Sequence, residues 1–243
     1  MFNRPWGIWN LHWQNRNNSR VFWYTLITLI LAMALPYSVV NQIMGYFGRS
    51  VFDPVTEIDR IIPFIGWSFV IYVSLYLYYP AAAWFGRNSD QRVREMFAFY
   101  QSLFIMTWAV LLIFIIFPTE IYIREDIPKP VRDGEGFWGL WYGDLMHKTD
   151  MPYNAWPSLH VTQSLMIVML LRRWKIVEGW TEILTWIAWI SLCISVLTTK
   201  QHFFFDLVTG ILTGIACWHL MCVPAIIASS NEEWKSAFPS NID

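Results

Sequence analysis

The sequence has few charged residues and few cysteines, and each shortage excludes a class of protein. Charged side chains make up 14% of its 243 residues, whereas ordinary soluble domains carry about 25%. The formal net charge is −1, so there is no basic excess of the kind that binds nucleic acid, and we expect no nucleic-acid partner. The three cysteines lie inside apolar runs without metal-site or redox spacing, which predicts a packing role for Cys193, Cys217 and Cys222.

Residues 1–20 lack the apolar core of a cleavable signal peptide, and we expect no such peptide here. Instead, three tryptophans recur at helix-like spacing among arginines: Trp6, Trp9 and Trp13. This pattern is typical of a short amphipathic helix that lies in the membrane interface. A disordered tail that carries a few tryptophans is the alternative.

Apolar residues make up 56% of the chain and fall in long runs. A helix that crosses a bilayer needs roughly 20 mostly apolar residues, and six segments approach this requirement. We therefore expect an all-α integral membrane protein with six transmembrane helices in one bundle over residues 21–230, followed by a C-terminal tail over residues 231–243. The expected spans are residues 21–42, 61–79, 98–117, 157–171, 181–199 and 203–228, with a long polar outer loop between the third and the fourth.

Individual residues refine this prediction. Pro36 is expected to kink the first span. The fourth span has a short apolar core, which polar residues 162–164 interrupt. Gly210 and Gly214 in the sixth span have the small-xxx-small spacing of a close helix contact. Tyrosines at the end of the second span are expected at the membrane–water boundary: Tyr72, Tyr76, Tyr78 and Tyr79.

The basic residues predict the orientation. With both termini in the cytoplasm, the inner segments hold ten of the 17 basic residues, the bias expected from the positive-inside rule. The loop before the fourth span and the turn before the sixth both follow an odd number of spans. His160 and His202 would therefore share one face, the extracytoplasmic one. The ten inner basic residues are Arg4, Arg16, Arg20, Arg87, Arg92, Arg94, Arg172, Arg173, Lys175 and Lys235.

The turn before the sixth span carries the first cluster with chemical potential. His202 and Asp206 are four residues apart, which places them on one face of a helix. A carboxylate that accepts from one ring nitrogen fixes the tautomer and leaves the other nitrogen as a nucleophile or base. Asp206 lies a full turn inside an apolar span, where an unpaired carboxylate is costly. A structural His–Asp pair that ties helices together is the alternative interpretation.

The start of the fourth span, Trp156-Pro157-Ser158-Leu159-His160, is the second cluster. Proline and serine here favour a helix start, and its free N–H groups with the Ser158 hydroxyl would bind a phosphate. His160 could then protonate a leaving oxygen. With Lys200 nearby, the two clusters supply a nucleophile, an acid and a positive charge for phosphoryl transfer. A capped helix with an interfacial histidine is the alternative.

These motifs resemble those of the type 2 phosphatidic acid phosphatase superfamily, whose members share Pro-Ser-x-His and, after another span, His-x-x-x-Asp on a six-helix core. The chain has both, as Pro157-Ser158-Leu159-His160 and His202-Phe203-Phe204-Phe205-Asp206. The longer forms Trp-Pro-Ser-Leu-His and Thr-Lys-Gln-His are most similar to the branch of inositol phosphorylceramide synthases. The resemblance covers about residues 117–212, the expected catalytic part.

The resemblance implies a role for each motif residue. His202 would be the nucleophile that forms a phosphohistidine, and Asp206 would orient it. His160 would act first as the acid and then as the base, and Ser158 would hold the phosphate. On this basis we expect a lipid phosphatase or phosphotransferase.

The chain departs from the family pattern in its basic residues. The usual Lys-x6-Arg-Pro motif before the long loop is absent, and the Ser-Arg pair before the nucleophile reads Ser195-Val196. Arg124 is the best substitute for the first motif, with Arg132 second. Lys200 is expected to replace the charge of the second.

The leading hypothesis is a membrane lipid phosphatase that hydrolyses a lipid phosphomonoester or pyrophosphate through a phosphohistidine, without a metal or other cofactor. Its expected partners are the lipid phosphate substrate and membrane lipids. The first alternative is a lipid phosphotransferase that moves a phospho-alcohol headgroup onto a lipid hydroxyl, as inositol phosphorylceramide and sphingomyelin synthases do. The second is a non-catalytic lipid-phosphate binding or transport protein.

No metal ligands are expected. A site made by His147, His160 and His202 is conceivable, but no short ligand spacing supports it. The acidic residues of the outer loop are expected to form a solvated face rather than a calcium site: Asp126, Asp133, Glu135, Asp144 and Asp150.

Overall fold

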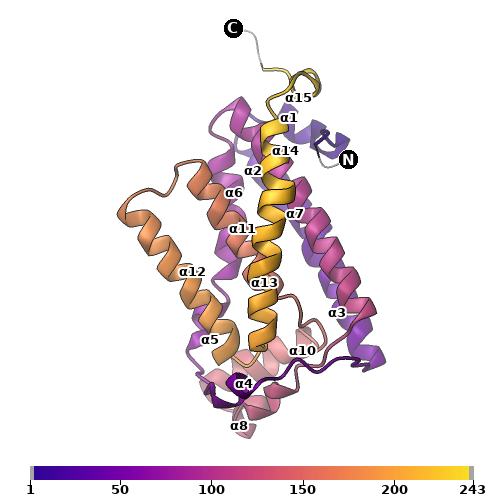
Figure 1. The fold of residues 1–243 in the computed structure, drawn as a ribbon, viewed down its shortest axis with the longest axis vertical. Coiled ribbons are helices and arrows are strands. Elements are labelled where there is room, and N and C mark those ends of the chain that lie inside the picture. Colours follow the sequence, from indigo (N-terminus) through magenta and orange to yellow (C-terminus); the bar gives the residue numbers. More distant parts are fainter. Residues whose placement is uncertain (1–2, 241–243) are drawn as a thin grey trace.

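The computed structural model describes residues 3–240. Within this range the chain forms helices and loops but no strand, and one isolated backbone bridge joins Thr119 to Asn154. The long helices run side by side along the vertical axis of Figure 1, and the two ends of the chain lie together at one end of the bundle. Short helices cover the opposite end, called the loop end below: α4 (Glu57–Ile61), α8 (Lys129–Arg132) and α10 (His147–Thr149).

Five helical stretches within residues 3–240 are long and apolar enough to cross a membrane, which confirms an all-α integral membrane protein. Span one is α2 (Arg20–Leu29), η2 (Ile30–Ala34) and α3 (Leu35–Phe47), and span two is α5 (Ser68–Tyr72) with α6 (Leu75–Gly86). The others are α7 (Asp90–Ile116), α12 (Trp180–Thr198), and α13 (Phe204–Cys217) continued by η5 (Trp218–Cys222) and α14 (Val223–Ala228).

The expected fourth span is α11 (Leu159–Arg173), whose 15 residues rise about 22 Å. This is shorter than the roughly 20 residues that a lipid-facing span needs, so a sixth crossing stays a prediction. α11 packs against α6, α7, α12 and α13, and 11 of its 15 residues are buried. Its polar side chains are hydrogen-bonded inside the bundle. Ser164 Oγ, for example, donates to the His160 carbonyl at 2.5 Å and lies 3.1 Å from the Trp189 indole nitrogen.

A close contact joins α11 to α13 and confirms the predicted role of the glycine pair. A Cβ added at Gly210 would lie 2.9 Å from the Ser158 carbonyl oxygen, and one at Gly214 would lie 3.0 Å from a leucine side chain of α11. The Thr162 hydroxyl lies 2.9 Å from the carbonyl oxygens of both Ser158 and Gly210. The missing side chains let the two backbones approach, and the N-terminal ends of both helices therefore lie next to each other.

The distortion expected at Pro36 takes the form of a π-helical turn. η2 ends two residues before this proline, and α3 begins at Leu35. A proline has no N–H to donate to the preceding turn, and a local π-helical turn is one of the usual ways in which a helix accommodates such a gap.

The expected end of span two at Tyr79 is corrected to Gly86. The tyrosines consequently lie in the interior of the span rather than at its end, and several contact other helices. Tyr79 donates its hydroxyl to Gln163 of α11, and its carbonyl accepts from the Tyr100 hydroxyl at 3.0 Å. Pro80 lies inside α6, and the sequence interpretation ended the span too early there.

The N-terminal segment folds against the bundle. η1 (Gly7–Trp9) and α1 (Asn10–Gln14) place Trp9 and Trp13 in the protein interior, 0% and 6% exposed. The Trp9 indole donates to the Gln101 side chain of α7 at 2.9 Å. The alternative of a disordered tail is therefore wrong for residues 3–20, whereas contact of this segment with lipid headgroups stays a prediction.

The segment after the last span also folds back. α15 (Glu232–Ala237) buries Trp234, whose indole donates to the Asn3 carbonyl at 2.7 Å. Phe238 packs its ring against Phe97 of α7 with centroids 5.6 Å apart. The two ends of the described chain therefore close one end of the bundle together.

The long loop between α7 and α11 is built from short helical turns that cover the loop end. They are η3 (Tyr122–Asp126), α8, α9 (Gly136–Gly139), η4 (Leu140–Met146) and α10.

We predict that Gly210→Ala destabilises the protein by about 1–3 kcal/mol, because the new methyl group collides with the Ser158 carbonyl oxygen at the start of α11, which cannot move independently. The measurement is the thermal unfolding midpoint in detergent. Ala216→Leu is the matched control, since it adds more volume at an exposed position of the same helix. An unchanged midpoint for Gly210→Ala would contradict the close contact.

Candidate active site

The two histidine motifs meet at the loop end of the bundle. His160 lies in the first turn of α11, and His202 lies just before α13. The Ser158 amide donates to the Asp206 carbonyl at 3.2 Å, and the rings of His160 and His202 have centroids 5.7 Å apart. Two segments that are far apart in the sequence thus present their histidines to each other, as the sequence interpretation requires.

Asp206 orients the His202 ring through one of its two nitrogens. The Nδ1 atom of His202 lies 3.3 Å from Oδ2 of Asp206, and the same oxygen accepts the Phe203 amide at 2.9 Å. Asp206 is 0% exposed, so it must be paired to be tolerated. Because Nδ1 faces the carboxylate, Nε2 is the nitrogen left for chemistry.

Asp59, which the sequence interpretation missed, anchors the same turn from α4. It is 2% exposed, and its Oδ1 accepts the Phe204 amide at 2.6 Å. Its Oδ2 accepts the amide and the hydroxyl of Thr56, both at 2.7 Å. The signal in the sequence is Thr56-Glu57-Ile58-Asp59, the spacing of a capping box. The carboxylate thus caps its own short helix and binds the start of α13.

Lys200 ties the His202 turn to the loops. Its backbone adopts a left-handed conformation with φ +58, at the position where helices commonly end with glycine. Its ammonium donates to the Asp59 carbonyl and to Asp126 Oδ2, both at 3.0 Å. The charge expected to serve a phosphate is therefore already shared with a carboxylate, and its role as a phosphate ligand stays a prediction.

Several buried polar atoms around the motifs have no hydrogen-bond partner within residues 3–240. Ser158 is 0% exposed and its Oγ is unpaired. The group also includes Oδ1 of Asp206 and Oε1 of Gln201. Buried polar groups are almost always paired, so unpaired atoms gathered near one place are typical of a site that receives a polar ligand.

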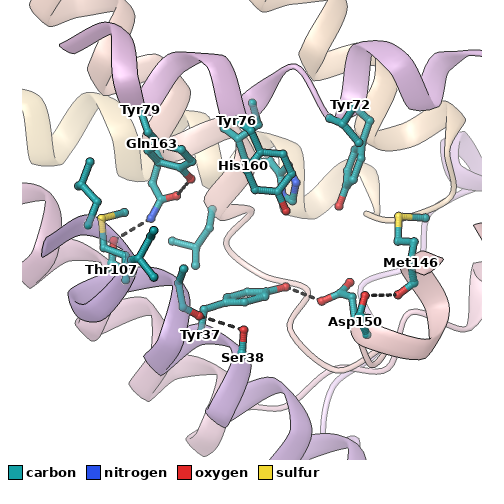
Figure 2. Close-up of a pocket in the computed structure, with 18 of the residues that line it drawn as sticks. Tyr37, Ser38, Tyr72, Tyr76, Tyr79, Thr107, Met146, Asp150, His160 and Gln163 are labelled. Carbon is teal, nitrogen blue, oxygen red and sulfur yellow. Dashed lines mark hydrogen bonds between the residues drawn. The ribbon is translucent and has the colours of Figure 1, made fainter. Parts of the chain in front are cut away.

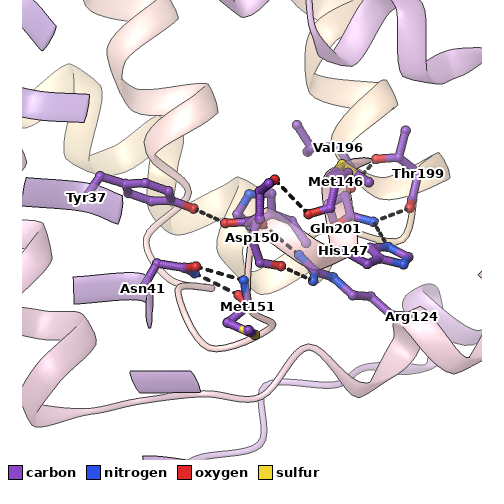
Figure 3. A network of polar contacts seen from close by, with 12 residues as sticks. Tyr37, Asn41, Arg124, Met146, His147, Asp150, Met151, Val196, Thr199 and Gln201 are labelled. Atoms are coloured by element: carbon purple, nitrogen blue, oxygen red, sulfur yellow. Dashed lines mark hydrogen bonds and ion pairs between the residues drawn. The ribbon is translucent and has the colours of Figure 1, made fainter. Parts of the chain in front are cut away.

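Arg124 lies beside the site but is held by Asp150. Its two terminal nitrogens donate to the Asp150 carbonyl at 2.7 Å and to Asp150 Oδ2 at 2.8 Å. Asp150 also accepts the Tyr37 hydroxyl at 2.7 Å. Asp150 therefore belongs to a partly buried network (Figure 3) and not to a solvated face. The Nε atom of Arg124 is buried without a partner among residues 3–240.

Span one is docked onto this network by Asn41. Its side-chain amide donates to the Met151 carbonyl and accepts the Met151 amide, each at 2.8 Å (Figure 3). Gly45, one turn further, meets the Met151 side chain so closely that an added Cβ would lie 2.4 Å from it. These contacts fix the loop that carries Asp150.

His147 is a neighbour of the site. Burial lowers its pKa to about 4, and the positive charge of Arg124 adds to this effect. The ring is therefore uncharged at neutral pH and lies 3.4 Å from the Gln201 side-chain nitrogen (Figure 3). Within residues 3–240 no three His, Cys, Asp or Glu side chains gather as a metal site would require.

A cavity of about 610 Å³ reaches His160 from the side of spans one and two (Figure 2). The His160 ring stacks on Tyr72 with centroids 4.4 Å apart and planes at 26°. His202, Asp206 and Ser158 do not line this cavity. Of the polar motif residues named above, His160 alone, with its neighbour Leu159, forms part of the wall of this space.

The comparison with known families agrees with this geometry. Residues 64–220 match the PAP2 superfamily. The chain belongs to this family, the type 2 phosphatidic acid phosphatases. The matching range contains both histidine motifs, all of α11 and most of the sixth span. No curated protein and no solved structure matches the chain significantly.

Membership in the PAP2 superfamily identifies the chain as a lipid enzyme of the phosphatase and phosphotransferase type. The arrangement has the parts of such a site: a histidine oriented by a buried carboxylate, a second histidine opposite it, and an unpaired buried hydroxyl. The branch of inositol phosphorylceramide synthases, expected from the longer motif forms, is not distinguished by this match.

We predict that Asp59→Asn destabilises the protein by about 1–3 kcal/mol, because the amide cannot accept hydrogen bonds at both of its terminal atoms. The measurement is the free energy of unfolding in detergent. Glu57→Gln is the control, since Glu57 belongs to the same short helix but its side chain is 88% exposed. Equal stability of the two variants would show that Asp59 does not anchor the turn.

Proposed function

We propose that the protein is a membrane lipid phosphatase that hydrolyses a lipid phosphomonoester or pyrophosphate through a phosphohistidine, with no metal in the reaction. The observation that carries this proposal is the His160–His202 pair, in which one ring is oriented by Asp206 and the other is not. Such an asymmetric pair divides the roles of nucleophile and acid between two histidines.

In the first half-reaction, the lone pair of His202 Nε2 attacks phosphorus and the bond from phosphorus to the leaving oxygen breaks. His160, protonated, gives its proton to that oxygen, so the leaving group departs as a lipid alcohol or, from a pyrophosphate, as a lipid monophosphate protonated at that oxygen. Asp206 stabilises the positive charge that develops on His202 through the Nδ1 hydrogen bond.

In the second half-reaction, the now neutral His160 takes a proton from water. The water oxygen attacks phosphorus, the phosphorus–nitrogen bond breaks and its electron pair returns to His202. Inorganic phosphate leaves, and both histidines are back in their initial protonation states. The same residue serves as acid and then as base, as microscopic reversibility allows.

The phosphate oxygens would bind the Ser158 hydroxyl and the first amides of α11, where the helix dipole favours an anion. Ser158 supports this role because its buried Oγ has no partner among residues 3–240. Arg124 and Lys200 would add charge. Among residues 3–240, Arg124 still has an unpaired Nε, and the Lys200 ammonium donates to two oxygens.

We further propose that the site faces the extracytoplasmic side, with both termini in the cytoplasm. The two ends of the described chain lie at one end of the bundle, and α11 and α13 begin at the other (Figure 1). The histidines lie at those helix starts. The charge bias of the loops favours the end with the termini as the inner one.

The second candidate function is a lipid phosphotransferase of the inositol phosphorylceramide or sphingomyelin synthase type. The cavity beside His160 is the observation in its favour. A lipid hydroxyl held there could give its proton to His160 and attack the intermediate in place of water. In that reaction the intermediate would carry a phospho-alcohol rather than a simple phosphate.

We predict that His202→Ala abolishes phosphate release and that His160→Ala lowers it by about 10²- to 10⁴-fold, the range of general acid catalysis. The assay uses phosphatidic acid and a prenyl pyrophosphate in detergent with a chelator present. His219→Ala is the control, because His219 is exposed on η5, well along the sixth span from the motifs. If the wild type releases no phosphate but transfers a headgroup to an added lipid alcohol, the transferase replaces the phosphatase.

The rate of phosphate release should depend on pH as a bell. The acid limb reflects protonation of the attacking nitrogen of His202, and the alkaline limb reflects loss of the proton that His160 donates. The measurement is kcat/KM against pH. A profile that stays flat from acid to alkaline pH would count against the histidine pair.

A further inference from the structure

The cavity beside His160 has a polar end and an apolar end. At the polar end, Tyr37, Tyr72 and Asp150 surround His160 (Figure 2). The opposite wall comes from span one and is aliphatic: Leu26, Leu29, Ile30, Met33 and Ala34. A volume of about 610 Å³ lies in the usual range for small-molecule sites. The gradient from polar to apolar suits a lipid whose reacting oxygen lies at His160.

Gln163 adds a polar amide to the wall of this cavity. It lines the cavity one helical turn from His160, yet it is 4% exposed. Its Oε1 accepts the Tyr79 hydroxyl, and its Nε2 donates to the Thr107 hydroxyl at 2.8 Å (Figure 2). The amide thereby touches α6 and α7 while it sits on α11.

These two hydrogen bonds do not use all the donors and acceptors of the amide. A glutamine side chain has two N–H groups and two lone pairs on its oxygen. One N–H and one lone pair of Gln163 remain unused among residues 3–240. Inside a membrane there is little water to satisfy them, and polar groups at such depth are costly and commonly functional. The cavity is the space from which a ligand could reach them.

We infer that Gln163 recognises a second polar group of the lipid, next to the oxygen that His160 protonates. The inference rests on the proposed function. The rise from His160 to Gln163 along α11 is about 4.5 Å, so the amide would meet atoms that are only a few bonds from the reacting oxygen. The substrate class is then a lipid phosphate with an ester, amide or hydroxyl beside the phosphate, as on glycerol or a sphingoid base.

This assignment excludes a class of substrate as well. A polyprenyl phosphate carries only hydrocarbon beyond its phosphate and offers nothing to the amide. Binding it would leave the spare N–H and lone pair of Gln163 buried against hydrocarbon, with a cost in affinity. We therefore expect the protein to prefer glycerolipid or sphingolipid phosphates to prenyl phosphates.

The competing interpretation is that Gln163 only ties α6, α7 and α11 together. The two interpretations differ in selectivity. If Gln163 only connects the helices, its removal should lower activity equally on every substrate. If it recognises the lipid, its removal should affect only substrates that carry the second polar group. Thr107→Val is the matched variant, because it removes one partner of the tie and leaves the amide in place.

The test measures kcat/KM for phosphatidic acid and ceramide 1-phosphate, with hexadecyl phosphate and farnesyl phosphate as probes that lack the second polar group. Gln163→Met should lower kcat/KM for the first pair by about 10- to 100-fold and leave that for the second pair nearly unchanged. Thr107→Val should keep the wild-type preference. The ratio of kcat/KM for phosphatidic acid to kcat/KM for ceramide 1-phosphate then shows whether the amide recognises the glycerol or the sphingoid backbone.

Equal losses on all four substrates, or the same loss of preference in Thr107→Val, would overturn recognition by Gln163. So would a wild type that prefers the two hydrocarbon probes. If the wild type turns over none of the four and transfers no headgroup, the proposed function itself is wrong and the inference falls with it. A wild type that is active but whose preference does not respond to Gln163→Met refutes the inference alone.

Discussion

The close approach of α11 to α13 at Gly210 is the constraint on which the site depends. The two histidine motifs lie on different helices, which must be held next to each other. Backbone atoms hold them there, because the Ser158 amide binds the Asp206 carbonyl and the Thr162 hydroxyl bridges the two helices. The geometry of the histidine pair thus depends on a backbone contact between the two helices and on the hydroxyl that bridges them.

The loops add a second layer, made of charges in compensated pairs. Lys200 binds Asp126, and Arg124 binds Asp150. Each cation is held near the histidines by a carboxylate from a different part of the chain.

The sequence predicts what depends on local pattern. Three such patterns depend only on residues close together in the sequence: the apolar runs, the His202–Asp206 spacing and the pair Gly210 and Gly214. The structure shows the element that each of them predicts. The role of α11 as a span is harder to predict from the sequence, because a helix enclosed by other helices needs neither 20 residues nor an apolar composition. The capping-box spacing marks Asp59 as a helix cap, but its contact with the Phe204 amide and the stacking of Tyr72 on His160 could not be found by pattern. Both contacts join segments whose distance along the chain says nothing about their distance in space.

Span one forms the aliphatic wall of the cavity, and it lies outside the region that matches the family, which begins at residue 64. Two kinds of parts can therefore be told apart in this chain. The histidines, the carboxylate and the helices that carry them belong to the shared portion, whereas one aliphatic wall of the cavity is supplied by a helix outside it. A lineage that retains the shared chemistry could adapt to a membrane of different lipid composition by exchanging aliphatic side chains on that one helix.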